Sequence, residues 1–260
     1  MTAAPPAIRP LALITGATAG IGRAFAERLA ARGLDLILVA RDAGRLEETG
    51  RELRGRHSID VEAFGADLSR DDEVSRLIVR MSETRGLAVL VNNAGFGSKG
   101  RLVEAAPGPQ AAMLHLHAIA PMRLTQAALP AMLAQRSGAV INVSSIASFI
   151  YAPGNVNYCA TKAYLRVFTE GLSAELTGSG VRVQALCPGL TRTEFHQRMG
   201  MDAARWRHRP WLTADYVVDA SLAAIDRGGP VVCIPSVRYR LIVALIRLIP
   251  RRWLGYLAGR

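Results

Sequence analysis

The chain has 260 residues, half of them hydrophobic, which is enough to bury the core of one large domain or of two smaller ones. Its formal net charge of +11 lies mostly at one end, because the last 23 residues hold six arginines and no acidic residue. The other 237 residues carry a net charge of only +5, so we expect no nucleic-acid partner.

The cysteines and the start of the chain bear on its compartment. Three cysteines form no CxxC pair and five histidines lack the spacing of metal ligands, so we expect neither a disulfide framework nor a metal site. Residues 1–10 lack the charged and apolar regions of a signal peptide. These features favour a cytoplasmic protein.

Short apolar runs alternate with helical patterns from residue 11 onward. The predicted strands are 11–15, 36–40, 61–64, 88–91, 139–143, 181–186 and 231–234. The predicted helices are 20–32, 45–56, 71–85, 110–135, 157–177 and 213–226. Runs that are apolar throughout are typical of strands buried on both faces of a parallel sheet. The alternation predicts a doubly wound α/β fold, a three-layer sandwich whose ligands bind at the carboxyl ends of the strands.

The first predicted strand runs into a glycine-rich turn, Thr15-Gly16-Ala17-Thr18-Ala19-Gly20-Ile21-Gly22. Its glycines suit a tight turn, a close approach to a pyrophosphate, and close packing of the helix on the strand. The free N–H groups at the start of the following helix favour an anion. The spacing does not match the dinucleotide fingerprint literally, but the position between strand and helix predicts a nucleotide site.

Charged residues follow the second and third predicted strands. Arg41 favours NADP, because an arginine accommodates a ribose 2′-phosphate whereas a carboxylate binds a 2′-hydroxyl. The adjacent Asp42 keeps NAD open as an alternative. Asp67 follows the third strand and suits either the adenine amino group or the N-cap of the next helix.

A tyrosine and a lysine lie four residues apart in a predicted helix, at Tyr158 and Lys162. Lys162 is one of only two lysines in an arginine-rich chain. A nearby ammonium favours the phenolate, which would lower the tyrosine pKa and suit it to general acid or base catalysis. Ser145, at the end of the fifth predicted strand, suits donation to a substrate carbonyl. Taken alone, the pair is a weak pattern that more often belongs to an ordinary amphipathic helix.

Several motifs in order give the chain a family resemblance. They are Thr-Gly-x-x-x-Gly-Ile-Gly, Asn-Asn-Ala-Gly, Ser145, Tyr158-x-x-x-Lys162 and Pro188-Gly189, spread over roughly residues 9–235. Together they resemble the short-chain dehydrogenase/reductase family. The resemblance implies a single Rossmann-like domain, residues 1–237, with a seven-stranded parallel sheet in the order 3-2-1-4-5-6-7.

The resemblance also implies roles for individual residues. Tyr158 would be the acid/base, Ser145 would polarise the carbonyl, and Lys162 would hold the nicotinamide ribose and lower the tyrosine pKa. The family's thirteen-residue spacing to the tyrosine selects Ser145 over Ser144. The implied cofactor is NADP(H), with NAD(H) as the alternative. The implied cofactor contacts are Gly16, Thr18, Gly20, Ile21, Gly22, Arg41, Asp67, Asn93, Ala94, Gly95, Tyr158, Lys162, Pro188, Gly189, Thr191 and Thr193.

One position departs from the family pattern. The family commonly has an asparagine 28 residues before the serine, where it helps to hold a water in a proton relay that reaches the lysine. Here the position is His117. We count His117 as a candidate catalytic residue, since a ring nitrogen or its carbonyl could serve the relay and a histidine could titrate near neutral pH. The alternative is a histidine that only fills space.

The segment 190–213 corresponds to the family's substrate lid. Its large apolar side chains favour a small lipophilic carbonyl or alcohol as substrate, such as a 3-oxoacyl compound, a steroid or a ketone. The alternative is a lid that packs on itself or on a neighbouring subunit. These side chains are Phe195, Met199, Met201, Trp206 and Trp211.

Residues 238–260 form a basic amphipathic extension. Its apolar run, 241–249, is too short to span a bilayer, which needs about 20 residues. Arginines together with leucines, isoleucines and aromatic residues favour peripheral membrane contact through 238–258, at the inner face of the membrane, or a subunit contact in a homodimer or homotetramer.

The resulting hypothesis is an NADP(H)-dependent oxidoreductase that reduces a carbonyl to an alcohol, or the reverse. The alternative from another class is a non-catalytic NADP-binding redox sensor or scaffold on the same fold. An epimerase or dehydratase is disfavoured, because the chain leaves little room for a second substrate domain.

Overall fold

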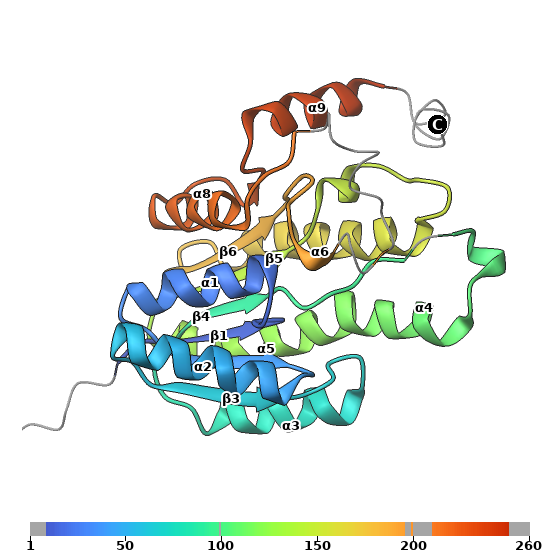
Figure 1. Ribbon diagram of the computed structural model, residues 1–260. Coiled ribbons are helices and arrows are strands. Elements are labelled where there is room, and N and C mark those ends of the chain that lie inside the picture. The colour runs from blue at the N-terminus through green and yellow to red at the C-terminus, as the bar shows by residue number, and fades with distance from the viewer. Residues whose placement is uncertain (1–8, 99, 196–198, 200–209, 250–260) are drawn as a thin grey trace, which may run out of the picture.

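A parallel sheet of seven strands runs through the computed structural model, which describes residues 9–98, 100–195, 199 and 210–249 (Figure 1). The strand order is β3-β2-β1-β4-β5-β6-β7, which confirms the predicted order. The strands are β1 (Leu11–Thr15), β2 (Asp35–Ala40), β3 (Val61–Gly65), β4 (Leu87–Asn92), β5 (Gly138–Val143), β6 (Val181–Leu186) and β7 (Val232–Cys233). Because all pairs are parallel, the carboxyl ends of β1, β4, β5 and β6 lie at one edge.

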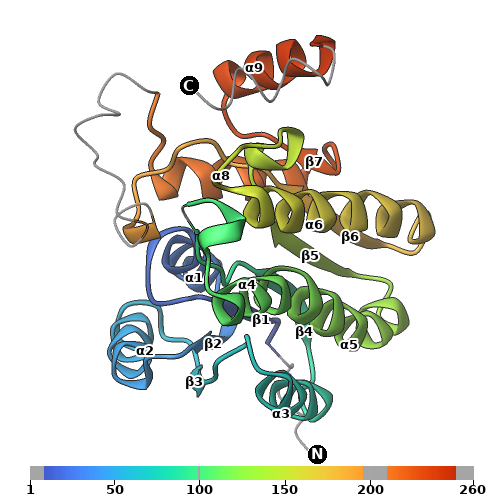
Figure 2. The same cartoon turned by 90° about the vertical axis from the view of Figure 1, so that its right-hand side faces the viewer.

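Helices cover both faces of the sheet, as Figure 2 shows from the side. One face carries α1 (Gly20–Ala31), α2 (Ala43–His57) and α8 (Ala214–Asp226). The other carries α3 (Asp71–Ser82), α5 (Ala120–Ala134) and α6 (Val156–Glu175), with α4 (Pro107–Leu114) leading into α5. Two short 3-10 turns, η1 (Leu102–Glu104) and η3 (Ile146–Phe149), complete the loops near the site. The predicted three-layer Rossmann-like sandwich is confirmed.

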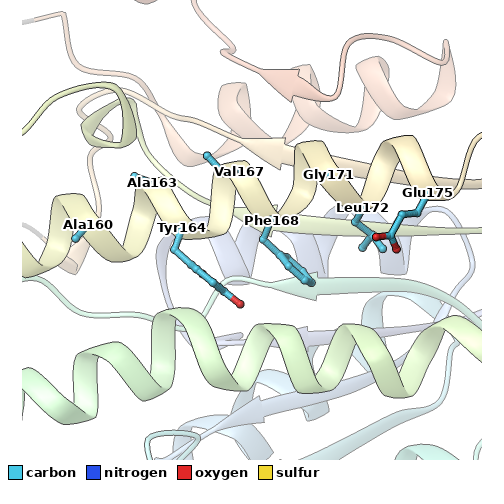
Figure 3. A pocket seen from close by; sticks show the side chains of 8 residues that line it. All are labelled: Ala160, Ala163, Tyr164, Val167, Phe168, Gly171, Leu172 and Glu175. Carbon is cyan, nitrogen blue, oxygen red and sulfur yellow. The ribbon is translucent and has the colours of Figure 1, made fainter. Parts of the chain in front are cut away.

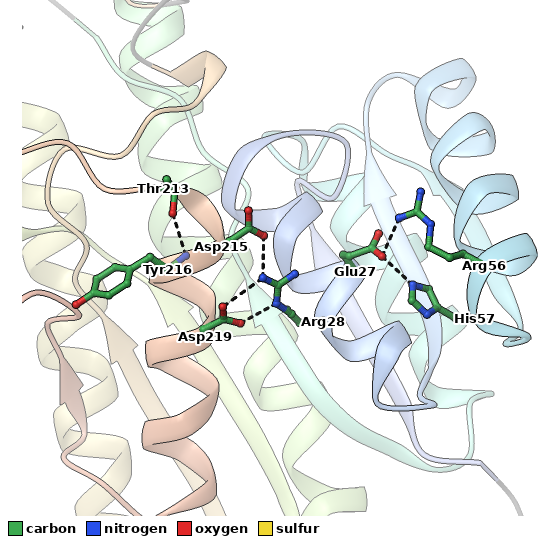
Figure 4. Close-up of polar contacts among 8 residues, drawn as sticks. All are labelled: Glu27, Arg28, Arg56, His57, Thr213, Asp215, Tyr216 and Asp219. Atoms are coloured by element: carbon green, nitrogen blue, oxygen red, sulfur yellow. Dashed lines mark hydrogen bonds and ion pairs between the residues drawn. The ribbon is translucent and has the colours of Figure 1, made fainter.

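Ion pairs join the helices of the first face (Figure 4). Arg28 of α1 contacts Asp215 and Asp219 of α8 at 3.1 and 2.7 Å. Glu27 of α1 contacts both Arg56 and His57 of α2 at 2.8 Å. Exposed pairs of this kind each contribute about 1 kcal/mol or less, so they orient the helices while the apolar core supplies the stability.

The long helix predicted at 110–135 is interrupted. Helix α4 ends at Leu114, a π-helical turn covers His115–Ile119 (η2), and α5 then begins at Ala120. The predicted helical stretch is thus helical over almost its whole length, and the π turn within it was not predicted, because one extra residue does not change which residues are apolar. Such turns are frequent at functional sites. Here the turn carries His117, which is 1% exposed.

Helix α9 (Val237–Leu248) packs at the end of the molecule beyond α6 and η3 (Figures 1 and 2). It begins one residue before the predicted boundary between the domain and the C-terminal extension, and its Tyr239 and Val243 are buried. The division at residue 238 stays a prediction. Among the residues that the structure describes, no helix is long and apolar enough to cross a membrane.

Candidate active site

The glycine-rich turn after β1 has the shape of a phosphate cradle. Gly16 and Gly20 have φ values of +68° and +54°, a region that side chains rarely adopt. A Cβ atom on Gly22 would lie 2.2 Å from the carbonyl oxygen of Gly16, so only glycine fits. Helix α1 has no side-chain cap at Ala19 and no acidic residue in its first turn. Its first N–H groups can therefore meet an anion.

The loop after β4 is fastened to this turn. The Nδ2 group of Asn93 donates to the carbonyl oxygens of Thr15 and Gly16 at 2.8 and 3.2 Å. The hydroxyl oxygen of Thr15 accepts from the backbone N–H groups of Asn93 and Ala94 at 2.9 and 3.0 Å. Asn93 thus holds the cradle in shape. Thr15 was not among the predicted site residues, although it stands directly before the first glycine.

The acidic residues that follow β2 and β3 accept hydrogen bonds from residues two or three positions further along the chain. Asp42 accepts from the backbone N–H of Arg45 at 3.0 Å and so caps α2, while Arg41 is exposed. Asp67 accepts from the backbone N–H and the hydroxyl of Ser69 at 3.0 and 2.8 Å. The alternative that Asp67 caps the next helix was wrong, because the N-cap of α3 is Arg70.

The segment after β6 closes over the same edge. Thr191 pairs with Leu212 across an isolated β-bridge, so the two ends of the predicted lid meet. A Cβ atom on Gly20 would lie 2.8 Å from the Cγ2 atom of Thr193, which brings the lid against the cradle. Glu194 pairs with Arg45 of α2 at 2.8 Å, a contact that the sequence analysis missed.

Tyr158 and Lys162 lie on the buried face of α6, beside the end of β5. The side chain of Ser145 lies near the Tyr158 hydroxyl and acts to lower its pKa. The ammonium of Lys162 lies 5.9 Å from the centroid of the Tyr158 ring and donates to the carbonyl oxygen of Val143 at 2.8 Å. Ser144 instead donates to the carbonyl oxygen of Lys162 at 2.7 Å. The structure thus brings Ser145, Tyr158 and Lys162 together.

The expected pKa of Tyr158 is corrected by the structure. Burial raises its pKa to about 12, although the nearby side chain of Ser145 opposes the rise. Burial also lowers the pKa of Lys162 to about 8. A lysine that is itself desolvated and bonded to a backbone carbonyl holds its charge weakly, so burial outweighs the expected effect on the tyrosine.

His117 contacts both the loop after β4, called the cofactor loop below, and helix α6. Its Nε2 atom accepts from the backbone N–H of Phe96 at 3.1 Å, so this nitrogen carries no proton. Its Nδ1 atom lies 3.0 Å from the hydroxyl oxygen of Thr161, to which it therefore donates. The Thr161 hydroxyl donates a hydrogen bond to the carbonyl oxygen of Tyr158 at 3.0 Å.

The titration state of His117 follows from its surroundings. Burial lowers its pKa well below the usual value, and the nearby Lys162 charge lowers it further. The expectation that His117 titrates near neutral pH was wrong, because a protonated ring would bury a charge and break the bond from Phe96.

Two apolar lid residues contact the site. The ring of Phe195 is centred 5.8 Å from that of Tyr158. Met199 contacts Gly97 so closely that a Cβ atom there would fall 2.0 Å from the sulfur. Met201 and Trp206, which were also predicted to line the lid, lie outside the described residues.

Comparison with known proteins gives the family. The profile of the family described as short chain dehydrogenase matches residues 10–204. An uncharacterised oxidoreductase of Staphylococcus saprophyticus is 34% identical over 222 residues, 85% of this chain and 93% of the relative.

Two solved structures share the fold. A short-chain dehydrogenase of Sphingobium yanoikuyae in complex with NADPH has a TM-score of 0.82 and 36% identity, covering 93% of this chain and 97% of that one. A bulky-bulky ketone specific alcohol dehydrogenase of Comamonas testosteroni has a TM-score of 0.78 and 31% identity, covering 93% and 95%. The chain therefore belongs to the short-chain dehydrogenase/reductase family of oxidoreductases.

Proposed function

We propose that the protein is an NADP(H)-dependent carbonyl reductase, which converts a lipophilic carbonyl compound to an alcohol or runs the reverse reaction. One observation supports this most. Ser145 and Tyr158 lie near one another, with Lys162 one turn further along α6, at the same sheet edge as the glycine cradle. A protein that only binds a nucleotide has no need of that trio.

The residues of the cradle suit a dinucleotide. The N–H groups of Gly20, Ile21 and Gly22 would hold the pyrophosphate, with Thr18 beside them. Arg41 is exposed and Asp42 caps α2, which favours a 2′-phosphate beside the arginine over a 2′-hydroxyl on the aspartate. The relative from Sphingobium yanoikuyae, solved with NADPH, supports the same choice. When bound, the nicotinamide supplies or accepts the hydride.

The other cofactor contacts follow from the same edge. Asp67 would contact the adenine, and Asn93, Ala94 and Gly95 would form the floor under the nicotinamide ribose. Lys162 would bond that ribose. Pro188 and Gly189, which follow β6, and Thr191 and Thr193, which lie at the start of the lid, would face the nicotinamide.

The proton follows a short path in the proposed reaction. Ser145 donates a hydrogen bond to the carbonyl oxygen and polarises it. Tyr158, whose pKa of about 12 keeps it protonated at neutral pH, gives its proton to the oxygen as negative charge develops there. Lys162 then stabilises the phenolate by its positive charge.

His117 acts in this proposal as a positioning residue. It is neutral, and both ring nitrogens are occupied by Phe96 and Thr161. It therefore fixes the distance between the cofactor loop and the turn of α6 that carries Tyr158. Its ring also meets the Tyr158 ring edge-on, with centroids 5.8 Å apart.

The lipophilic substrate is inferred from the lid. Phe195 places an aromatic ring beside Tyr158, and Met199 places a thioether against Gly97 in the loop after β4. Such side chains adapt to irregular apolar ligands. The ketone specificity in the name of the Comamonas testosteroni relative points to the same class of substrate.

The proposal also covers the compartment and the oligomeric state of the enzyme. Cys159, Cys187 and Cys233 are free and buried, which suits a reducing cytoplasm. The homodimer or homotetramer stays a prediction. A groove along the outer side of α6, lined by Ala160, Tyr164 and Val167 among others, offers one apolar face for a second copy (Figure 3).

Replacement of Tyr158 by phenylalanine tests the proposal. We expect Tyr158→Phe to lose ketone-dependent NADPH oxidation by about a thousandfold or more, while NADPH binding, followed by fluorescence, stays within about threefold of the wild type. Ser144→Ala is the matched control, because Ser144 faces Lys162 rather than Tyr158. If no ketone, steroid or 3-oxoacyl thioester is reduced by the wild type although NADPH binds, the redox-sensor alternative holds instead.

A further inference from the structure

Helix α9 turns an uninterrupted apolar stripe to solvent. Val237, Leu241, Leu245 and Leu248 follow at spacings of three or four residues, so they share one face, and each is 60–80% exposed. The outer face of a helix on a globular protein is ordinarily polar. A contiguous apolar stripe of this kind marks a contact surface.

The opposite face of α9 is fixed to the protein, so the stripe cannot turn inward. The Tyr239 hydroxyl donates to the carbonyl oxygen of Pro210 at 3.0 Å and accepts from the backbone N–H of Leu190 at 3.1 Å. The Tyr239 ring lies so close to Gly189 that a Cβ atom there would fall 2.2 Å from it. Val243, on the same side, is 3% exposed.

The charges beside the stripe are all positive. Arg238 and Arg240 are exposed and flank it on either side, and Arg247 lies with its guanidinium 5.0 Å from the centroid of the Phe149 ring. No acidic residue occurs from residue 237 to the end of the chain, whereas 250–260 adds three arginines, a tryptophan and a tyrosine to the sequence. Apolar residues flanked by arginines match a layer with an apolar interior and an anionic surface.

A second copy of the chain fits this surface less well. In a symmetric dimer the same patch meets itself, so the flanking arginines of two helices would face each other. Like charges brought together in this way oppose association. Helix α9 offers no acidic residue to relieve the repulsion.

We propose that α9 lies on an anionic lipid surface, with its apolar stripe in the acyl boundary and Arg238 and Arg240 at the headgroups. Tyr239 joins this helix to Leu190 and Pro210 at the base of the lid, so the lid would stand close to the lipid. A lipophilic substrate would then reach the lid from the membrane. The membrane contact itself does not depend on the proposed reaction.

Vesicle sedimentation of the full chain tests the proposal. We expect binding to vesicles of phosphatidylcholine with phosphatidylserine, and at least about tenfold weaker binding to phosphatidylcholine alone or at high salt. The double variants Leu241→Gln/Leu245→Gln and Arg238→Gln/Arg240→Gln should each lose binding by about tenfold or more. Val167→Gln on α6 is the matched control, since it removes an exposed apolar side chain elsewhere.

Two outcomes would overturn the proposal. In the first, the wild-type protein does not bind vesicles, or binds them equally well with and without phosphatidylserine. The other is a molecular mass that falls to the monomer in Leu241→Gln/Leu245→Gln without any vesicle binding by the wild type, since a second copy would then cover the stripe. Circular dichroism and NADPH binding of each variant show that it is folded, and neither measurement depends on turnover.

Discussion

The two faces of α6 differ in their buried polar content. The buried face carries the polar residues Tyr158, Thr161, Lys162 and Thr169 among apolar ones, whereas Tyr164 and Val167 on the outer face are exposed. Hydrogen bonds satisfy these buried groups, as from Asn142 to Thr169 at 2.9 Å and from Lys162 to the carbonyl oxygen of Val143 at 2.8 Å. Buried polar groups destabilise a fold unless they are hydrogen-bonded. Polar residues at positions where apolar ones are expected often mark a functional site.

Loss of the buried ammonium is expected to have the largest effect. In Lys162→Met the tyrosine loses the positive charge that stabilises its phenolate, and the cofactor ribose loses a donor. We expect kcat/KM for ketone reduction to fall by about 100- to 10,000-fold. Lys162→Arg should not restore activity, because a guanidinium is larger and differently shaped. An unimpaired Lys162→Met enzyme would show that the buried face is only structural.

The same variant should change how stability depends on pH. The folded pKa of Lys162 is about 8 against a usual 10.5, so between these pH values the unfolded chain binds a proton that the folded chain does not. Wild-type stability relative to Lys162→Met should therefore rise from pH 8 to pH 10.5, by up to about 3 kcal/mol.

Urea unfolding of both proteins at several pH values measures this difference. The comparison with Lys162→Met cancels the opposing effect of Tyr158, whose raised pKa lowers stability above pH 10. A difference that stays flat over the range would mean that Lys162 is not desolvated.

Replacement of His117 separates positioning from proton transfer. His117→Asn can still accept from Phe96 and donate to Thr161, so we expect turnover within about tenfold of the wild type. His117→Leu leaves the N–H of Phe96 without an acceptor and should raise the KM for NADPH more than it lowers kcat. The pH profile of kcat should be the same in His117→Asn and in the wild type. If the wild-type pH profile of kcat instead shows an ionisation that is missing in His117→Asn, then His117 transfers protons during turnover.

Stability in acid provides a second measurement for His117. Its folded pKa is lowered, so the stability that it contributes is complete above its usual pKa of about 6.5 and is lost as the pH falls below that value. Wild-type protein should lose stability relative to His117→Asn in this range. Equal acid sensitivity would show that the histidine is not held neutral.

The smallest effect is expected on the outer face of α6. Val167→Gln should leave kcat and KM within about twofold, because Val167 lies away from Tyr158. If a second copy covers the groove, the same change should lower the molecular mass seen by analytical ultracentrifugation. If Val167→Gln loses much of its turnover while its molecular mass in solution is unchanged, then the outer face of α6 also contributes to catalysis and the distinction between the two faces is wrong.

The sequence patterns predicted the sheet well because buried parallel strands are apolar throughout. All seven strands lie within three residues of their predicted ends, and the sheet order came with the family resemblance. The π turn at His115–Ile119 could not be predicted, since the insertion of one residue leaves no mark on the apolar pattern.

The partners of the site residues could be predicted only in part. The motif spacing correctly predicted that Ser145, Tyr158 and Lys162 lie together. The nearby ammonium suggested a lowered tyrosine pKa, which was wrong, because burial raises it and burial depends on the whole fold. The bonds of Thr15 to the cofactor loop and of Thr161 to His117 join residues distant in the chain. Single-sequence patterns carry no signal for such pairs.

Isotope transfer tests the central claim most directly. The protein would be incubated with a responsive ketone and NADPH carrying deuterium at both hydrogens of nicotinamide C4, and the alcohol would be analysed by mass spectrometry and NMR. We predict one deuterium on the carbinol carbon of the wild-type product, and a rate at least about a thousandfold lower with Tyr158→Phe. Alcohol without deuterium, or equal rates in the two proteins, would contradict hydride transfer assisted by Tyr158.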